Sequence, residues 1–362
     1  MSGIVSDNVD DGSGVINTPA GGATVSSSNP TTSTNAELGT NWANSSTGDY
    51  YILTDATTDS NVWTNVDAAQ DSIKPFHGFG SNYGFAAGGY ASGYSAAVDK
   101  VSFASGGDST GHCSLYRGMT QGAGCSSTTD GYQLGGEYSG HEYDDTVQKF
   151  SFTSTSTGTD IGNLTVAKDK LGGSSSESHA YSVGGDSGPA SNVLDRFAFS
   201  GSFSCADVGD LTVARKWIAG SSSATYGYAL GGQTNSDVVD KFLFGSSATA
   251  SDVGNLTVGR SHVATQQSGT YVYASGGSSP TSDVIDKSDV ASDGNSVDVG
   301  NLSVARYEPS GCSSKTHGYT QGGYVSASSN VVDNFSFAAG TQNASDVGNL
   351  VANRDSSSGT QY

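Results

Sequence analysis

Short runs of apolar residues alternate with polar turn residues along this chain, and this pattern predicts strands. A typical run extends from Val238 to Phe244, and clusters of Gly, Ser, Asn and Asp lie between such runs. β-Branched and aromatic runs bounded by turn residues are typical of β-strands. No stretch keeps a helical period without Gly or Ser for long enough to build a helix. We therefore predict an all-β chain.

The pattern is repeated six times. A double glycine ends a short aromatic run in each unit, and the first glycines of successive pairs lie 45 to 49 residues apart. The pairs are Gly88–Gly89, Gly135–Gly136, Gly184–Gly185, Gly231–Gly232, Gly276–Gly277 and Gly322–Gly323. Glycine permits positive φ and close approach of backbones, so we expect these residues to be structural.

Each unit holds four candidate strands. They are the Ser-rich stretch after a basic residue, the aromatic run into Gly-Gly, a Val-x-Asp-Lys-Phe segment, and the residues around Asp-Val-Gly-Asn-Leu, clearest at Asp252 to Leu256. Four antiparallel strands at this period match one blade of a β-propeller, in which kelch-type units run at about 50 residues.

The chain resembles kelch-repeat propellers, in particular the divergent kind found in virion proteins of marine tailed phages. The resemblance rests on Gly-Ser-Asn-Tyr-Gly-Phe at Gly80 to Phe85, on Asp-Val-Gly-Asn-Leu-Thr-Val, on His317 to Gly323, and on a head motif at Ser2 to Asn8. The repeats depart from ordinary kelch units because they lack a tryptophan in the fourth strand.

Ring closure can be predicted from the parts left over. Residues 74–354 hold six repeat units, 355–362 copy the start of a unit, and 49–73 contain two further candidate strands with Trp63. We predict a propeller over residues 49–362 with seven blades, one of them composed of 355–362 and 49–73. The alternative is six blades with residues 50–66 as a separate hairpin.

Residues 1–48 have too few apolar residues to fold alone. The resemblance implies that this tract is an attachment tail that docks to other virion proteins. Its candidate docking residues are Ile4, Val5, Val9, Val15 and Ile16.

Charge narrows the classes of partner. The net charge is −20, from 35 acidic and 15 basic residues, which disfavours nucleic acid and anionic lipid as partners.

Most basic residues fall into two repeat columns, that is, at two equivalent positions of successive units, and acidic columns match them. The basic columns are Lys100, Lys149, Arg196, Lys241 and Lys287, then Arg117, Lys168, Arg215, Arg260, Arg306 and Arg354. The acidic columns are Asp99, Asp195, Asp240, Asp286 and Asp333, then Asp160, Asp207, Asp252, Asp298 and Asp346. Groups that recur in every unit suit structural ion pairs and Asp-capped turns better than a ring of cation-binding carboxylates.

We expect no enzyme, cofactor or metal. The six histidines have no spacing typical of zinc sites, and no nucleophile motif lies in a strand–helix context. Cys113 and Cys125 are close enough in sequence to pair, although free buried thiols are the expected state of all four cysteines. A hydrolase or copper oxidase on a propeller is the enzymatic alternative.

Any binding specificity is expected in the segments that differ between units, because loops on a rigid scaffold usually carry it. The alternative for these segments is loop drift without function. The richest insertion spans 137–145, with Tyr138, His141, Glu142, Tyr143, Asp144 and Asp145 as candidate residues for a sugar ligand. The resemblance implies a virion fibre or surface appendage that is made in the host cytoplasm and attaches to a host surface glycan. No stretch approaches about 18 apolar residues and no basic segment precedes an apolar block at the N-terminus, so we expect neither membrane insertion nor a signal peptide. Fibre-like appendages are often trimers. The alternatives are an architectural decoration protein of the capsid or tail and a cellular kelch-type interaction module.

Overall fold

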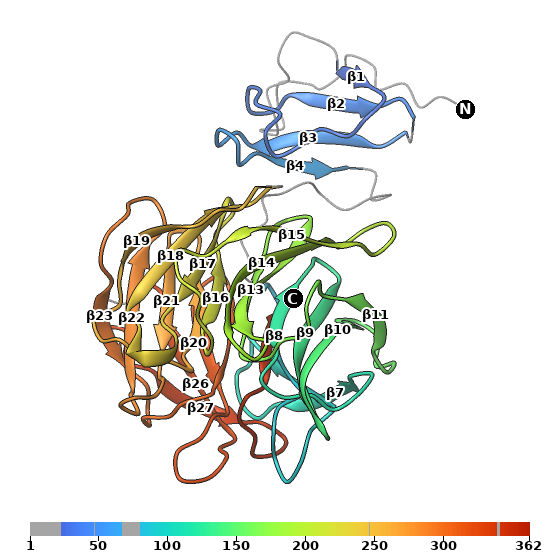
Figure 1. The fold of residues 1–362 in the computed structure, drawn as a ribbon. Coiled ribbons are helices and arrows are strands. Elements are labelled where there is room, and N and C mark those ends of the chain that lie inside the picture. The colour runs from blue at the N-terminus through green and yellow to red at the C-terminus, as the bar shows by residue number, and fades with distance from the viewer. Residues whose placement is uncertain (1–22, 47, 67–79, 246, 339–340) are drawn as a thin grey trace. The chain divides into compact units, whose positions relative to one another are not determined.

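The computed structural model describes residues 23–46, 48–66, 80–245, 247–338 and 341–362. These ranges are all-β apart from one 3₁₀ turn, η1 (Gln233–Asn235). Figure 1 shows the arrangement of the strands within each unit. No helix in the described part is long and apolar enough to cross a bilayer. The chain divides into two compact units, residues 1–75 and 76–362.

The first unit contains one four-stranded sheet. Its strands are β1 (Thr24–Ser26), β2 (Asn41–Asn44), β3 (Tyr50–Asp55) and β4 (Val62–Asn65), in that order across the sheet. β1 and β2 are parallel, and the other pairs are antiparallel. Tyr51, Leu53 and Trp63 are buried, and Trp42 meets Trp63 edge-on with ring centroids 5.8 Å apart. A small apolar core thus stabilises this sheet.

The second unit contains six four-stranded antiparallel sheets. They are β8 (Ala123–Ser126), β9 (Asp130–Tyr138), β10 (His141–Ser151) and β11 (Thr159–Asn163); β12 (Gly172–Ser175), β13 (His179–Asp186), β14 (Ala190–Ala198) and β15 (Cys205–Asp210); β16 (Ala219–Ser222), β17 (Tyr226–Leu230), β18 (Val238–Leu243) and β19 (Ser251–Asn255); β20 (Ala264–Gln267), β21 (Tyr271–Ser275), β22 (Val284–Asp289) and β23 (Val297–Asn301); β24 (Ser310–Ser313), β25 (His317–Gln321), β26 (Val331–Ser336) and β27 (Ser345–Asn349); and β28 (Ser358–Gln361), β5 (Tyr83–Ala87), β6 (Ala97–Ser102) and β7 (Thr110–Ser114).

These six sheets have a propeller-like arrangement around a central axis. Their inner strands are β8, β12, β16, β20, β24 and β28, and each inner strand contacts the next. β28 also contacts β8, so the succession of inner strands closes on itself. We call this unit the six-sheet ring.

The predicted closing blade, composed of residues 355–362 and 49–73, is wrong. β28 pairs with β5, with Ser358 opposite Ala87 and Gln361 opposite Gly84, and not with residues 50–66. The two strands predicted at residues 50–66 exist as β3 and β4, but they pair within the N-terminal sheet. The first repeat has no inner strand of its own, so the open edge of β5 accepts the C-terminal strand. The described residues of the second unit form six sheets, as in the alternative, but residues 50–66 belong to a four-stranded sheet and not to a separate hairpin.

The boundary of the predicted tail is also too late. Residues 24–26 and 41–44 are β1 and β2 of the N-terminal sheet. Trp42 of β2 packs against Trp63 of β4, so the core of this sheet includes a residue of the predicted tail. Residues 1–22, with the five candidate docking residues, lie outside the described residues.

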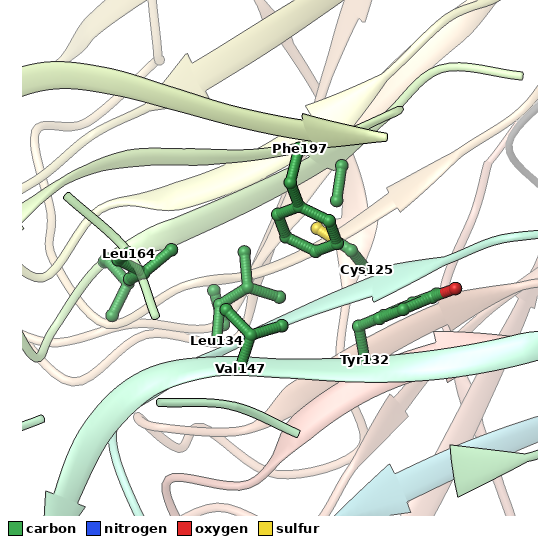
Figure 2. Close-up of a cluster of buried hydrophobic side chains, with 9 residues drawn as sticks. Cys125, Tyr132, Leu134, Val147, Leu164 and Phe197 are labelled. Carbon is green, nitrogen blue, oxygen red and sulfur yellow. The ribbon is translucent and has the colours of Figure 1, made fainter. Parts of the chain in front are cut away.

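Adjacent sheets of the ring pack through apolar side chains. Figure 2 shows one such cluster, in which the Phe197 ring of β14 points toward Cys125 of β8 and Val147 of β10. Phe197 is 1% exposed, and burying such a side chain stabilises the fold by about 1.5–3 kcal/mol. The aromatic ring of the second strand in one sheet also meets the Phe of the third strand in the next, as in Tyr132 and Phe197 with centroids 5.6 Å apart.

The double glycines have the structural role that the sequence predicts. All twelve glycines have positive φ. At Gly135 and Gly136 a Cβ atom would lie 2.6 Å from the carbonyl oxygens of Lys168 and Thr120, respectively. Only glycine permits this backbone conformation together with such close approach between neighbouring segments.

An ion pair joins each of the six neighbouring pairs of sheets, and five of the six are buried. The basic residue that follows the fourth strand of one sheet reaches the third-strand Asp of the next. The pairs are Arg117–Asp144, Lys168–Asp195, Arg215–Asp240, Arg260–Asp286, Arg306–Asp333 and Arg354–Asp99. The predicted structural ion pairs are thereby confirmed.

The other charged columns are structural too. Each Asp of the fourth strands accepts a hydrogen bond at 3.1 Å from the backbone N–H of the glycine two residues on, as Asp252 does from Gly254. Lysines of the third strands lie over second-strand tyrosines, as Lys287 lies 4.6 Å from the ring centroid of Tyr271.

All four cysteines are free, and we expect them to resist alkylation in the folded protein. Burial raises the pKa of Cys113 to about 11 and those of Cys125 and Cys205 to about 12. For Cys312 burial raises the pKa well above its usual range. Because the thiolate is the reactive form, iodoacetamide at about pH 8 should leave the native thiols intact and modify all four in guanidinium chloride. Mass spectrometry would count the adducts, and rapid native labelling of Cys125 would contradict the buried position of β8.

Candidate binding site at the axial mouth

Six residues form a backbone ring at the end of the axis where the inner strands begin. Each lies two positions before an inner strand and has a φ between 53° and 56°. Each donates its N–H to the carbonyl oxygen of its counterpart in the preceding sheet, at 2.7 to 3.1 Å, and the six bonds form a closed cycle. The residues are Gln121, Lys170, Trp217, His262, Glu308 and Ser356. We call this set the mouth ring.

The side chains of the mouth ring are all different, whereas the double glycines recur in every unit. The left-handed conformation is uncommon outside glycine, and its recurrence at six side-chain-bearing positions indicates a geometry imposed by the scaffold. One position therefore brings an amide, an ammonium, an indole, an imidazole, a carboxylate and a hydroxyl to a single place.

His262 and Glu308 are coupled in this ring. The imidazole Nε2 lies 3.3 Å from Glu308 Oε1, and Ser356 Oγ donates to Glu308 Oε2 at 2.9 Å. Burial raises the pKa of Glu308. Burial, helped by the nearby Lys170 charge, lowers the pKa of His262 to about 4. The pair therefore consists of a neutral imidazole and a hydrogen-bonded carboxyl group near neutral pH.

Lys170 belongs to a second polar cluster beside the ring. Its Nζ pairs closely with Asp169 and lies 3.8 Å from Asp186 Oδ2, and Lys216 Nζ approaches the same Asp186 oxygen at 2.6 Å. The Asp169 side chain is fully buried, and burial raises its pKa to about 6 although Lys170 opposes the shift.

The mouth ring surrounds a cavity of about 80 Å³. Besides the six ring residues, the residue after each of them contributes to the lining: Gly122, Leu171, Ile218, Val263, Pro309 and Ser357. A narrower channel of about 50 Å³ follows along the inner strands, lined mainly by glycines and by polar side chains such as Ser126, Ser175 and Ser222. The channel side chains hold neighbouring strands together, as when Ser175 N–H donates to Ser222 Oγ at 2.8 Å.

The chemistry of the mouth suits hydrogen bonding better than proton transfer. His262 Nδ1 lies 2.9 Å from Ser261 Oγ and 3.0 Å from Ser278 Oγ, so a Ser–His–Glu succession exists. An imidazole whose pKa is about 4 is a weak base at neutral pH, and general base catalysis favours a pKa near the working pH. Among the described residues, no group of three or more His, Cys, Asp and Glu side chains is placed to hold a metal ion.

The insertion singled out in the sequence lies in the β9–β10 hairpin. Glu137 bridges to Thr120, the neighbour of Gln121, so this hairpin leaves the ring at the same end as the mouth. Tyr138 stacks on His141 with centroids 4.3 Å apart, and the Arg117 guanidinium lies 4.1 Å from the centroid of Tyr138. His141 and Glu142 are exposed, and Tyr143 and Asp145 are partly exposed.

Asp144 is not a loop residue available to a ligand. It is 7% exposed and pairs with Arg117, in the same role as the third-strand Asp of the other sheets. The longer β9–β10 hairpin, with its register shifts, hides this equivalence in the sequence. A binding role of the other hairpin residues stays a prediction.

Sequence reasoning missed the mouth ring. In five units its member lies two residues after the basic column, as Trp217 follows Arg215. In the first unit Met119 takes the backbone position of that column, since its carbonyl accepts from Gly89 N–H as the Arg215 carbonyl does from Gly185 N–H. The signal available in the sequence was a repeat position, close behind the basic column, at which the six units carry six different residues.

No protein-family model matches this chain, and no curated protein matches it closely enough to be a relative.

Opposite pH dependences are expected for two variants of this site. Asp169 has a folded pKa of about 6, raised from 3.8, so it makes the fold less stable as the pH rises from about 4 to 6. His262 has a folded pKa of about 4, lowered from 6.5, so it makes the fold less stable as the pH falls from about 6.5 to 4. Each contribution is about 3 kcal/mol at most.

Urea unfolding between about pH 4 and 7 would measure both effects as differences from the parent protein. Asp169→Asn should gain stability relative to the parent as the pH rises, and His262→Gln should gain it as the pH falls. Parallel curves for the parent and either variant would contradict the burial of that group beside Lys170, Asp186 and Glu308.

Proposed function

We propose that the six-sheet ring is a non-enzymatic binding module whose ligand is held at the axial mouth. The observation that carries this proposal is the mouth ring: six unlike side chains converge at one end of a scaffold that is built from repeated units. Rigid scaffolds that present varied side chains at one end are suited to recognition. The weakly basic His262 supports binding over proton-transfer catalysis.

The wider setting that we propose is a phage virion appendage with a kelch-like β-propeller. The four-stranded antiparallel sheets, the units of 45 to 49 residues and the shared strings from Gly80 to Phe85 and His317 to Gly323 support it. In this proposal the N-terminal residues dock to a capsid, neck or tail protein, and the ring faces a glycan of the host surface. The net charge of −20 is consistent with a partner other than nucleic acid.

Cryo-electron microscopy of intact particles tests the setting. We expect density for a six-sheet disc on the particle, and its loss when residues 2–20 are deleted. A deletion variant that unfolds at the parent's urea midpoint provides the control for folding. Normal incorporation without residues 2–20, or particles that lack the protein, would overturn the virion proposal.

Adsorption tests the binding role. Particles with Lys170, Trp217 and Glu308 all replaced by alanine should attach to host cells several-fold more slowly than the parent. Normal adsorption combined with lower particle stability would instead assign an architectural decoration role.

A further inference from the structure

The cavity at the mouth contains two polar groups without a partner among the described residues. The side-chain oxygen of Gln121 is buried and accepts no hydrogen bond. The indole N–H of Trp217 lines the same cavity and donates to no described group. The residues that carry this acceptor and this donor therefore line a common space. A buried polar group without a partner costs about 1–3 kcal/mol, so a ligand that donates to Gln121 Oε1 gains affinity.

The lining of the cavity is divided into an apolar arc and a polar arc. The residues that follow Lys170, Trp217, His262 and Glu308 are all apolar, and three of them are nearly fully buried: they are Leu171, Ile218, Val263 and Pro309. Gln121, Glu308 and Ser356 supply polar groups. The cavity can thus receive a methyl group and hydrogen-bonding atoms side by side.

The charges of the lining disfavour an ionic ligand. Lys170 and Glu308 both border the cavity, so a cation would meet the ammonium and an anion would meet the carboxyl group. Desolvating an ion without a matched partner is costly. A neutral polar group avoids this penalty on both sides.

The volume limits the size of the buried group. About 80 Å³ corresponds to roughly two to three times the share of one water molecule in the liquid, which is about 30 Å³. The remainder of a larger ligand would lie at the rim, which carries aromatic rings such as Tyr90, 43% exposed, and Tyr324. Aromatic faces beside polar groups suit a sugar ring.

We propose that the cavity binds the acetamido group of an N-acetylated amino sugar. Its N–H donates to Gln121 Oε1, its carbonyl oxygen accepts from the Trp217 indole N–H, and its methyl group packs on Leu171, Ile218 and Val263. This inference rests on the proposed function, because it names the ligand class of the same mouth.

Saturation-transfer NMR and titration calorimetry on the full chain test this inference. N-acetylglucosamine and N-acetylgalactosamine are the probes, and glucose and glucosamine, which lack the acetamido group, are the ligand controls. We expect binding of the two acetamido sugars, with the strongest saturation at the acetamido methyl, and at least about ten-fold weaker binding of the controls. Equal binding of all four sugars, or no binding of any, would overturn the inference.

Two variants test the assigned contacts. Trp217→Phe keeps an aromatic ring and removes the N–H, and Gln121→Leu removes the acceptor at similar volume. Each should weaken acetamido binding by about ten-fold while the urea midpoint stays near that of the parent. Lys287→Met, on β22 and outside the cavity lining, is the matched control and should leave binding unchanged. Unchanged affinity in both cavity variants, or tighter binding of an N-acetylated peptide than of the sugars, would overturn the assignment.

Failure of this inference can be distinguished from failure of the proposed function. If the protein binds host cells and Trp217→Phe binds them equally well, the acetamido site is overturned and the binding module stands. If the parent binds no host surface, the proposed function itself is overturned.

Discussion

Deletion of residues 357–362 is expected to abolish the cooperatively folded ring. These residues contain β28, which pairs with β5 along four residues and contacts both β24 and β8. Tyr362 adds an aromatic contact to Phe152, with centroids 5.4 Å apart. Without β28, three neighbouring strands lose a partner and exposed edges favour aggregation. The lost backbone hydrogen bonds, at about 0.5–1.5 kcal/mol each, and the lost packing would together remove a large part of a stability that is typically about 5–15 kcal/mol.

Far-UV circular dichroism during urea unfolding would measure this effect. The truncated chain should show no steep transition, whereas deletion of residues 1–66, which removes the separate N-terminal sheet, should leave the transition of the ring in place. A synthetic peptide of residues 355–362 should restore structure by strand addition if the defect is confined to the open edge. A truncated chain that unfolds at the parent's midpoint would show that β28 does not close the ring.

Replacement of Arg260 by methionine is expected to destabilise the ring by about 3–5 kcal/mol, because it leaves Asp286 buried without its counter-charge. Both side chains are fully buried, and Arg260 Nη2 lies 2.8 Å from Asp286 Oδ2. The guanidinium also donates to the backbone oxygen of Val284 at 2.9 Å. The substitution therefore removes bonds between two adjacent sheets and leaves a buried carboxylate that keeps only the hydrogen bonds from the Thr257 N–H and hydroxyl and no counter-charge.

Lys287→Met provides the matched control for this prediction. Lys287 lies on the same strand, but its side chain makes only the contact with the Tyr271 ring, so the change should cost about 1 kcal/mol or less. Guanidinium titration gives both free energies of unfolding. A cost for Arg260→Met no greater than that for Lys287→Met would contradict the structural role of the buried pairs.

The repeat determined much of the fold from the sequence alone. Double glycines, alternating apolar strands and Asp columns are local requirements of backbone conformation and strand burial, so five of the six units reveal their own four strands. The pairing of the charged columns could also be predicted, because a buried cation in every unit needs an anion in every unit. The ion pair of the candidate residue Asp144 was not predicted, because the long β9–β10 hairpin shifts this residue relative to the equivalent Asp of the other units.

Only the tertiary structure decided which strand closes the ring and where unlike side chains meet. Residues 50–66 and the open edge of β5 both lack a partner in the sequence, and β28 could pair with either. Packing against β24 and β8 accompanies its pairing with β5. The mouth ring is assembled from residues dozens of positions apart, through hydrogen bonds between sheets such as that from Lys170 N–H to the Gln121 carbonyl. Self-similarity identifies what the units share, whereas the candidate site depends on what differs between them, and only closure of the ring brings those differences together.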